Sequence, residues 1–260
     1  MLSLEMVGIH TGLRGSISTN LLFLVTAREV FESIRRSLDE ELGEYKGKPG
    51  FTLILGRYSD KDLLLACVPP YPHALVDALR ELYIFGARKV IYVGEGFRLK
   101  GDYDVLVALY ALPRDSASRL LAPVGFPLVA SLDLAQTLLG SRSFREERLE
   151  LENKMSLAIG TAISADSLSS EEVLKKAVAE SKKLRGSVAI DCCTSALYAL
   201  RYVYAIDALS LILTVLDVAK LKTLISVAEA ERLSEEIREL SLKLFPMIFE
   251  GVLRGGESGV

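Results

Sequence analysis

Short runs of aliphatic and β-branched residues alternate with amphipathic stretches along most of the chain. Residues 21–26 have the unbroken apolar character of a buried strand, whereas residues 29–41 carry apolar side chains at helical spacing. The apolar runs 51–56 and 62–68 are joined by the polar turn 58–61, which predicts a β-hairpin. The chain therefore opens with a strand, a helix and a hairpin.

The same alternation continues to the end of the chain. We expect strands at 89–94, 104–112, 157–163, 187–190 and 208–215, and helices at 73–85, 131–139, 171–180, 193–204 and 228–249. Such alternation predicts one α/β domain over residues 1–254, with a mixed, mainly parallel central sheet flanked by helices. The charged run 142–154 is expected to form a surface loop or insertion, and residues 255–260 a disordered tail.

The charge pattern argues against nucleic-acid and membrane partners. The net charge is −3, and no basic stripe is visible in the sequence. The longest apolar run, 205–219, is interrupted by Asp207 and Asp217 and is too short to cross a bilayer. Residues 1–10 carry Glu5 within their apolar stretch, which makes a poor signal peptide. We expect a cytoplasmic protein.

The three cysteines are an odd number, and two of them are adjacent, which favours a reducing compartment over a disulfide framework. The two histidines lie far in sequence from the cysteine pair, so no metal site is expected. The chain has only two asparagines and one glutamine. Depletion of these thermolabile amides is one signature of proteins from thermophiles.

Three stretches resemble the hexameric uridine phosphorylase and purine nucleoside phosphorylase family. The first is 82–96 (LYIFGARKVIYVGEG), which resembles a helix, a glycine and a strand that ends in R-V-G-[ST]. The second is 111–131 (ALPRDSASRLLAPVGFPLVAS), which is similar to the family's segment A-x-R-D-x-x-S-R-x-x-x-P…FP-x-x-A. The third is 188–217, which is similar to the family's segment from V-E-M-E-A-A-A-L-Y to T-V-S-D. The resemblance covers roughly residues 8 to 250 and implies the nucleoside phosphorylase fold, without fixing the function.

The resemblance implies a phosphate site that this sequence has largely lost. Arg28 is near the arginine of the family's G-D-P-x-R loop, in a loop that is one residue shorter. In the R-V-G-[ST] turn, Tyr92 replaces the arginine, Gly94 is retained and Glu95 replaces the hydroxyl residue. The family's glycine-rich turn is replaced by 69–72 (PPYP), which offers few backbone donors.

The ribose site implied by the resemblance is also altered. The methionine and glutamate of the family's M-E pair fall on Cys192 and Cys193, and a thiol is a weak acceptor for ribose hydroxyls. Asp191 precedes this pair and would compensate only if the turn shifted. His10 matches the histidine that reaches the ribose of a neighbouring subunit, with a surface or capping histidine as the alternative. The arginine that the family borrows from that subunit falls at Pro49, with Lys48 beside it.

For the base, the family's S-x-D-x-F-Y segment is matched by Asp166, while Leu168 and Ser169 stand where the stacking aromatic residues belong. Asp217 matches the acid that protonates the leaving base in the purine enzymes, although an aspartate after a buried strand is also a common helix cap. We therefore take Asp217 as the candidate catalytic residue.

Three functions remain open at this stage. The first is an active phosphorylase with phosphate as co-substrate and no cofactor. The second is a nucleosidase that uses water, with Glu29 or Glu95 to orient it. The third is a non-catalytic relative that binds a nucleoside or lends His10 to an active paralogue in a hetero-oligomer. The segment 114–127 lies near the dimer contact of the resembling family, so we expect a homo-oligomer, either a dimer or a hexamer.

Overall fold

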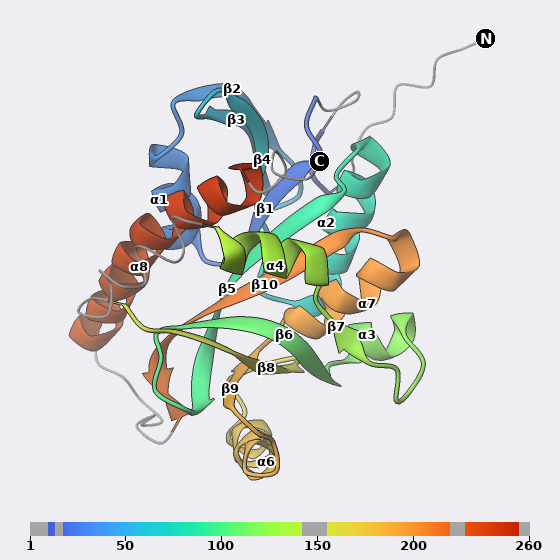
Figure 1. The fold of residues 1–260 in the computed structure, drawn as a ribbon, viewed down its shortest axis with the longest axis vertical. Coiled ribbons are helices and arrows are strands. Elements are labelled where there is room, and N and C mark those ends of the chain that lie inside the picture. Colours follow the sequence, from blue (N-terminus) through green and yellow to red (C-terminus); the bar gives the residue numbers. More distant parts are fainter. Residues whose placement is uncertain (1–9, 14–17, 142–154, 219–226, 255–260) are drawn as a thin grey trace.

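The computed structural model describes residues 10–13, 18–141, 155–218 and 227–254, and its centre is a mixed sheet (Figure 1). The strands lie in the order β10-β6-β8-β9-β5-β1-β4-β3-β2, with β7 paired to β6. Their bounds are β1 Leu21–Val25, β2 Glu40–Lys46, β3 Thr52–Tyr58, β4 Lys61–Cys67, β5 Lys89–Lys100, β6 Val105–Arg114, β7 Leu128–Val129, β8 Leu157–Ala165, β9 Ser187–Asp191 and β10 Asp207–Asp217.

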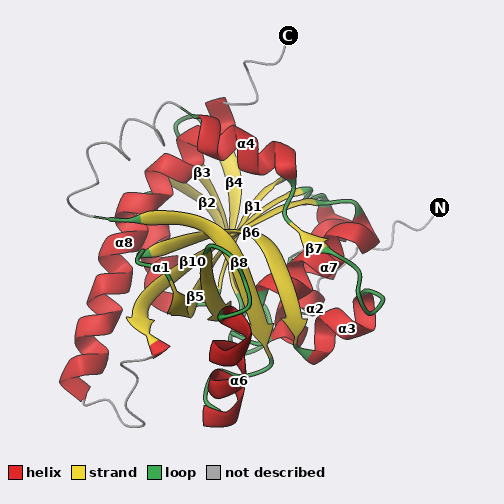
Figure 2. Ribbon diagram, turned by 60° about the horizontal axis from the view of Figure 1, so that its bottom comes forward, coloured by secondary structure: helices red, strands yellow, loops and turns green. Residues whose placement is uncertain are grey.

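The long strand β5 closes half of this sheet on itself. It pairs with β1 and β10 in parallel and with β9 in antiparallel fashion, so that β5, β10, β6, β8 and β9 form a ring of paired strands (Figure 2). Of the pairings described, five are parallel and five antiparallel. The prediction of a mixed α/β sheet is confirmed, with antiparallel pairings as numerous as parallel ones.

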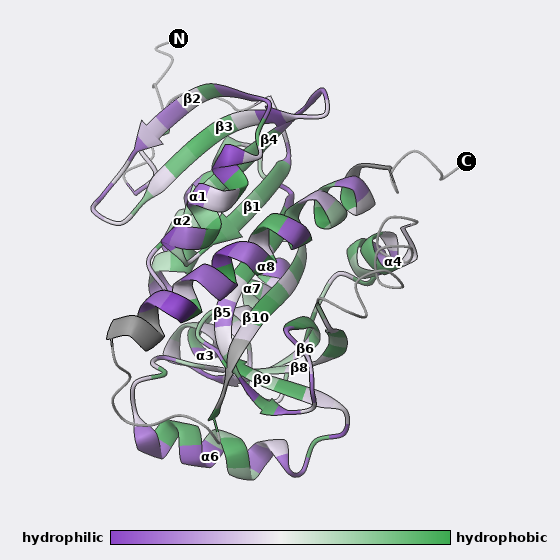
Figure 3. Cartoon of the chain, turned by 90° about the vertical axis from the view of Figure 1, so that its left-hand side faces the viewer, coloured by the Kyte–Doolittle hydropathy of each residue, from purple (hydrophilic) through white to green (hydrophobic). Residues whose placement is uncertain are grey.

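Two groups of helices flank the sheet. Contacts join α8 to α1 and α4 in one group, and α7 to α2 and α3 in the other. Helix α6 lies apart from both groups and contacts β5 (Figures 1 and 2). Their bounds are α1 Arg28–Arg36, α2 Pro72–Phe85, α3 Ser116–Leu121, α4 Leu132–Gly140, α6 Glu171–Ser181, α7 Thr194–Tyr204 and α8 Val227–Arg254. Figure 3 shows hydrophobic residues concentrated on the strands and hydrophilic ones on the outer side of α8.

An aromatic cluster fixes α8 against the sheet. Phe23 of β1 contacts Phe245 and Phe249 of α8 with ring centroids 5.2 and 6.0 Å apart, and Tyr58 of β3 lies 4.4 Å from Phe249. The three phenylalanines are fully buried. Offset and edge-to-face pairs of this kind add to the stabilisation from burial alone. Through this cluster α8 is positioned over the carboxyl ends of the central strands.

The predicted helix 29–41 is wrong in its second half. Helix α1 ends at Arg36, and Glu40–Lys46 forms the edge strand β2 instead. The side chains of β2 are mostly exposed and polar, so the strand has no apolar alternation that could separate it from a helix in sequence. The bidentate pair of Arg35 with Glu41, at 2.8 Å, joins the end of α1 to β2.

Two further predictions fall outside the described residues: the surface loop at 142–154 and the disordered tail at 255–260. The short elements α3 and β7 were not expected from the sequence. In the described part of the chain, no helix has the length and apolar character needed to cross a membrane.

Candidate active site

A cavity of about 220 Å³ opens at the carboxyl ends of β1 and β9, beside the middle of the longer strand β5, and we call it the strand-end cavity. Ligand sites of open α/β sheets gather at such ends because loops and helix termini converge there. It is lined by Thr26, Pro70, Tyr92, Glu95, Gly96, Phe97, Leu168, Cys192, Leu213, Leu233 and Ile237. None of these residues is cationic.

Tyr92 fills the space where the resemblance places a phosphate-binding arginine. Its side chain is fully buried, and its hydroxyl lies 3.3 Å from the hydroxyl of Thr26. The ring lies over Gly94, because a Cβ at Gly94 would stand 2.6 Å from ring atom Cε1 and closer still to Cζ and the hydroxyl. Burial raises the pKa of the Tyr92 phenol well above its ordinary value, so the group stays neutral.

Among the described residues, Glu95 is the one carboxyl group in the lining of the strand-end cavity. Burial raises its pKa to about 7, and the charge of Glu29 in the first turn of α1 acts in the same direction. The group therefore exchanges its proton near neutral pH, the range in which a general acid or base is most effective. When ionised, it repels an anion placed beside it.

Cys192 lies at the cavity as a neutral thiol. Burial, reinforced by the charge of Asp191, raises its pKa to about 12, and the backbone of Leu168 hydrogen-bonds to its sulfur. A protonated thiol is a poor nucleophile and only a weak hydrogen-bond partner. Cys192 and Leu168 thus present a mainly apolar wall to any ligand.

Two residues predicted to bind substrate have structural positions instead. Asp191 is fully buried, and its carboxylate accepts hydrogen bonds from the Ser164 hydroxyl at 2.6 Å and from the backbone and hydroxyl of Thr194 at 2.9 and 2.6 Å. It holds the first turn of α7 and has no capacity left for ribose. Cys193 is fully buried beside Tyr92 and does not line the cavity.

His10 lies away from the strand-end cavity, against α2. Its Nδ1 is 2.7 Å from Glu81 Oε1, and its Nε2 is 2.9 Å from the ammonium nitrogen of Lys48. His10 therefore contacts Lys48, the neighbour of the position to which the resemblance assigns the borrowed arginine. His10 is not among the residues that line the strand-end cavity.

Three other predicted residues also lie outside the lining. Asp166 accepts hydrogen bonds from the backbone and the hydroxyl of Ser116, each at 2.9 Å, at the start of α3. Arg28 is the exposed first residue of α1, and its charge acts on Cys67 at the end of β4. Asp217 is the last residue of β10 and its backbone is in register with Arg98 of β5, but its side chain is not described.

The part of the cavity wall formed by α8 could not be predicted from the sequence. Leu233 and Ile237 of α8 close the cavity from above the sheet, and Phe97 closes it from β5. A helical apolar stripe shows that one face of α8 is buried but not which strand ends it covers. Among the described residues, no group of three or more histidine, cysteine, aspartate or glutamate side chains is placed to hold a metal ion.

No protein-family model matches the chain, and no curated protein sequence matches it. Its structure is similar to uridine phosphorylase from Vibrio fischeri, with a TM-score of 0.76 and 17% identity over 98% of this chain and 100% of that one. It is also similar to purine nucleoside phosphorylase from Toxoplasma gondii in complex with immucillin-H, with a TM-score of 0.73 and 18% identity over 94% of this chain and 96% of that one. The chain has the nucleoside phosphorylase fold. At this identity the likeness establishes the fold alone.

On the nucleoside phosphorylase fold, the sequence motifs and the geometry meet at one place. The residues matched to the R-V-G-[ST] turn and to the M-E pair supply Tyr92, Glu95 and Cys192 to the strand-end cavity. The matched S-x-D segment supplies Leu168 to it and directs Asp166 elsewhere. The cavity is thus built from the expected segments with changed side chains.

Proposed function

We propose that this chain is a divergent member of the nucleoside phosphorylase family that binds a nucleoside or a related compact ligand without phosphorolysing it. The observation that carries the proposal is the lining of the strand-end cavity, where a buried neutral Tyr92 and the carboxyl of Glu95 stand in place of phosphate-binding groups. Apolar walls at Leu168, Leu213 and Ile237 suit the flat face of a base.

Phosphorolysis needs donors for a phosphate dianion beside the breaking glycosidic bond. Each preorganised donor removed from such a site costs about 2–4 kcal/mol of transition-state stabilisation. Here Tyr92 replaces a cation, Glu95 adds an anion, and Pro70 contributes a ring where a backbone N–H is needed. Even with strong non-additivity, these losses lower phosphorolytic turnover by orders of magnitude.

The second candidate is a nucleosidase that uses water. It is favoured by the proximity of Glu95 and Glu29, whose interaction helps to raise the pKa of Glu95 to about 7. A carboxyl poised at this pKa can accept a proton from water, and Asp217 at the end of β10 would protonate the leaving base. Phosphate-independent base release that is lost in Asp217→Asn would support this candidate.

The third candidate is a subunit that completes the site of a paralogue. Its support is the contact of His10 with Lys48, because the family resemblance assigns His10 and the position next to Lys48 to contacts with a neighbouring subunit. The apolar side chains on and after α3 supply a contact for such an assembly. Leu120 and Val124 are 81% and 99% exposed. Neighbouring exposed apolar side chains of this kind are typical of protein–protein contact surfaces.

We also propose a cytoplasmic location and a thermophilic source. The cysteines Cys67, Cys192 and Cys193 are all free, as is usual in a reducing compartment. The scarcity of asparagine and glutamine supports the thermophilic source.

Titration calorimetry with inosine, adenosine and uridine tests ligand binding directly. We expect at least one nucleoside to bind, with an affinity that phosphate does not change. Leu168→Trp should weaken binding by about tenfold or more, because the indole fills the cavity. Leu184→Trp is the matched control, since Leu184 is a partly buried leucine of the same apolar cluster that does not line the cavity. Absence of nucleoside binding to the unmodified chain would contradict the proposal.

A further inference from the structure

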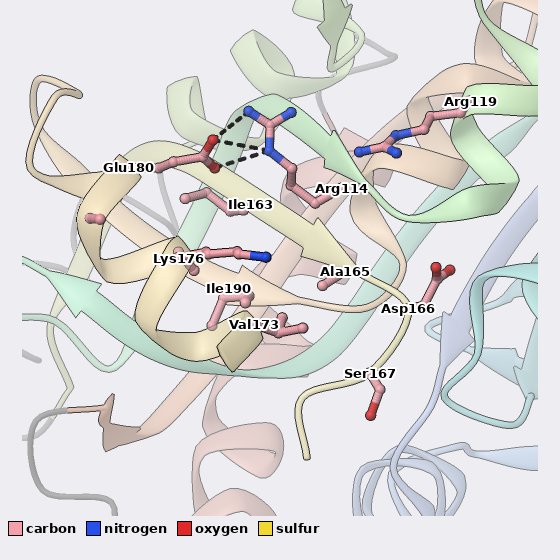
Figure 4. A pocket seen from close by; sticks show the side chains of 12 residues that line it. Arg114, Arg119, Ile163, Ala165, Asp166, Ser167, Val173, Lys176, Glu180 and Ile190 are labelled. Atoms are coloured by element: carbon pink, nitrogen blue, oxygen red, sulfur yellow. Dashed lines mark hydrogen bonds and ion pairs between the residues drawn. The ribbon is translucent and has the colours of Figure 1, made fainter. Parts of the chain in front are cut away.

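A second, larger cavity of about 550 Å³ lies between α6 and the strands β6, β8 and β9 (Figure 4). It shares no lining residue with the strand-end cavity. Its lining consists of Arg114, Arg119, Ile163, Ala165, Asp166, Ser167, Val173, Lys176, Ala177, Ala179, Glu180 and Ile190. We call it the α6 cavity.

The floor of the α6 cavity is apolar because one face of the sheet meets the inner side of α6 there. Ile163 and Ile190 project from neighbouring strands, and Val173 faces them from the helix (Figure 4). Ala165 and Ala177 are too small to fill the space between these layers, so a gap remains where larger side chains would make a closed core. Such a floor favours an apolar ligand body.

The rim of the cavity carries charges of both signs. The Nε of Arg114 donates to the two carboxylate oxygens of Glu180 at 3.0 and 3.1 Å. The charges of these two side chains therefore neutralise each other. Asp166 is likewise engaged by the backbone and hydroxyl of Ser116. The carboxylates of the rim are therefore already occupied.

Two cations of the rim are placed to act on a ligand, one without a partner among the described residues and one in an exposed ion pair. Arg119 makes no hydrogen bond or ion pair within the described residues, and its guanidinium is directed toward Arg114 (Figure 4). Lys176 extends across the cavity and pairs only with Glu172, through an exposed i,i+4 contact of 2.6 Å. Exposed pairs of this kind are weak and exchange readily. The lining holds three cations and two carboxylates, and Glu172 just outside it pairs with Lys176. Arg119 is therefore the one cation of the lining without a partner among the described residues.

We propose that the α6 cavity binds a small organic anion with an apolar body and one carboxylate, held by Arg119 and Lys176. The apolar floor takes the body, and Arg119, the one cation of the lining without a partner among the described residues, matches a monoanion rather than a phosphate dianion. An arginine guanidinium pairs with a carboxylate through two parallel hydrogen bonds, which fixes the orientation of the ligand. This site is distinct from the nucleoside site and does not depend on it.

Binding of 2-naphthoate to the full chain tests the proposal, with 2-naphthamide as an uncharged probe of nearly the same shape. We expect saturable binding of the acid, measured by its fluorescence, and binding of the amide weaker by about tenfold or more. Arg119→Ala and Lys176→Ala should each weaken binding of the acid by a similar factor. Lys175→Ala is the matched control, because Lys175 has the same exposure and an equivalent i,i+4 pair with Glu171 but does not line the cavity.

The comparison of Lys176→Ala with Lys175→Ala separates a built site from general attraction to the surface. Unchanged affinity in Lys175→Ala, together with loss in the other two variants, supports the α6 cavity. The proposal is overturned if the acid does not bind, if the amide binds equally well, or if the two lysine variants lose affinity to the same extent. Loss of binding on Leu168→Trp alone would place the acid in the strand-end cavity and would also overturn it.

Discussion

The ring of Tyr92 lies over the Cα of Gly94 and leaves no room for a side chain there. Both project to the same face of β5 because they are two residues apart on one strand. The hydroxyl of Tyr92 is turned to Thr26 at the end of β1. A position that the sequence resemblance assigns to anion binding is therefore part of the packed core.

Gly94→Ala should destabilise the protein, because the added methyl would collide with the Tyr92 ring. We expect the free energy of unfolding to fall by about 1–3 kcal/mol, measured by urea denaturation. Gly43→Ala is the matched control, since Gly43 also faces a tyrosine two residues away on its strand, but at 3.4 Å from the ring of Tyr45. Tyr92→Val should restore part of the loss in the Gly94→Ala background. Equal losses at the two glycines would contradict the packing described.

The carboxyl of Glu95 should make stability depend on pH. Its pKa is raised from 4.5 to about 7 in the folded state, so the folded protein binds the proton more tightly than the unfolded chain does. The free energy of unfolding should therefore fall as pH rises from about 4.5 to about 7, by up to about 3 kcal/mol, and level off above that range.

Glu95→Gln tests this origin of the pH dependence. Denaturation at pH 5 and pH 8 should show a smaller pH-dependent loss in the variant than in the unmodified protein, and greater stability than the unmodified protein at pH 8. Glu29→Gln should reduce the loss in part, because the charge of Glu29 contributes to the raised pKa. The same pH-dependent loss in Glu95→Gln would show that another group is responsible.

Asp191 and Asp166 offer a second paired test. Both accept hydrogen bonds at a helix start, but Asp191 is buried while Asp166 is exposed. Asp191→Asn should cost roughly 2–3 kcal/mol of stability, because an amide cannot accept at both positions and leaves buried donors unpaired. Asp166→Asn should cost about 0.5–1 kcal/mol. Similar losses in thermal or urea denaturation would argue against a capping role for Asp191.

These residues also show how far sequence alone reaches. The strand and helix order followed from hydrophobic periodicity, and the motif resemblance located Tyr92, Glu95, Leu168 and Cys192 at one cavity. The sequence did not reveal that Asp191 turns inward, because that depends on Ser164 of β8, a distant residue in the sequence, lying beside the start of α7. Edge strand β2 was missed for a related reason. Its own polar sequence does not indicate a strand, and it is one because it pairs with β3.

An oligomer should depend on the exposed apolar side chains that follow α3. We expect light scattering at micromolar concentration to give a mass of at least twice the 28.5 kDa of one chain. Val124→Asp should shift the population toward the monomer, because a carboxylate buried in an apolar contact is costly. Leu242→Asp is the control, an exposed leucine on α8. A monomeric unmodified protein would refute this prediction.

We expect that the strand-end cavity does not support phosphorolysis. The most direct measurement is release of free base from inosine, adenosine and uridine, with and without phosphate, by the unmodified chain. The lining of Tyr92, Glu95 and Pro70 predicts that phosphate adds nothing to the rate. Phosphate-dependent turnover of about one per second, an ordinary enzymatic rate, would contradict this expectation.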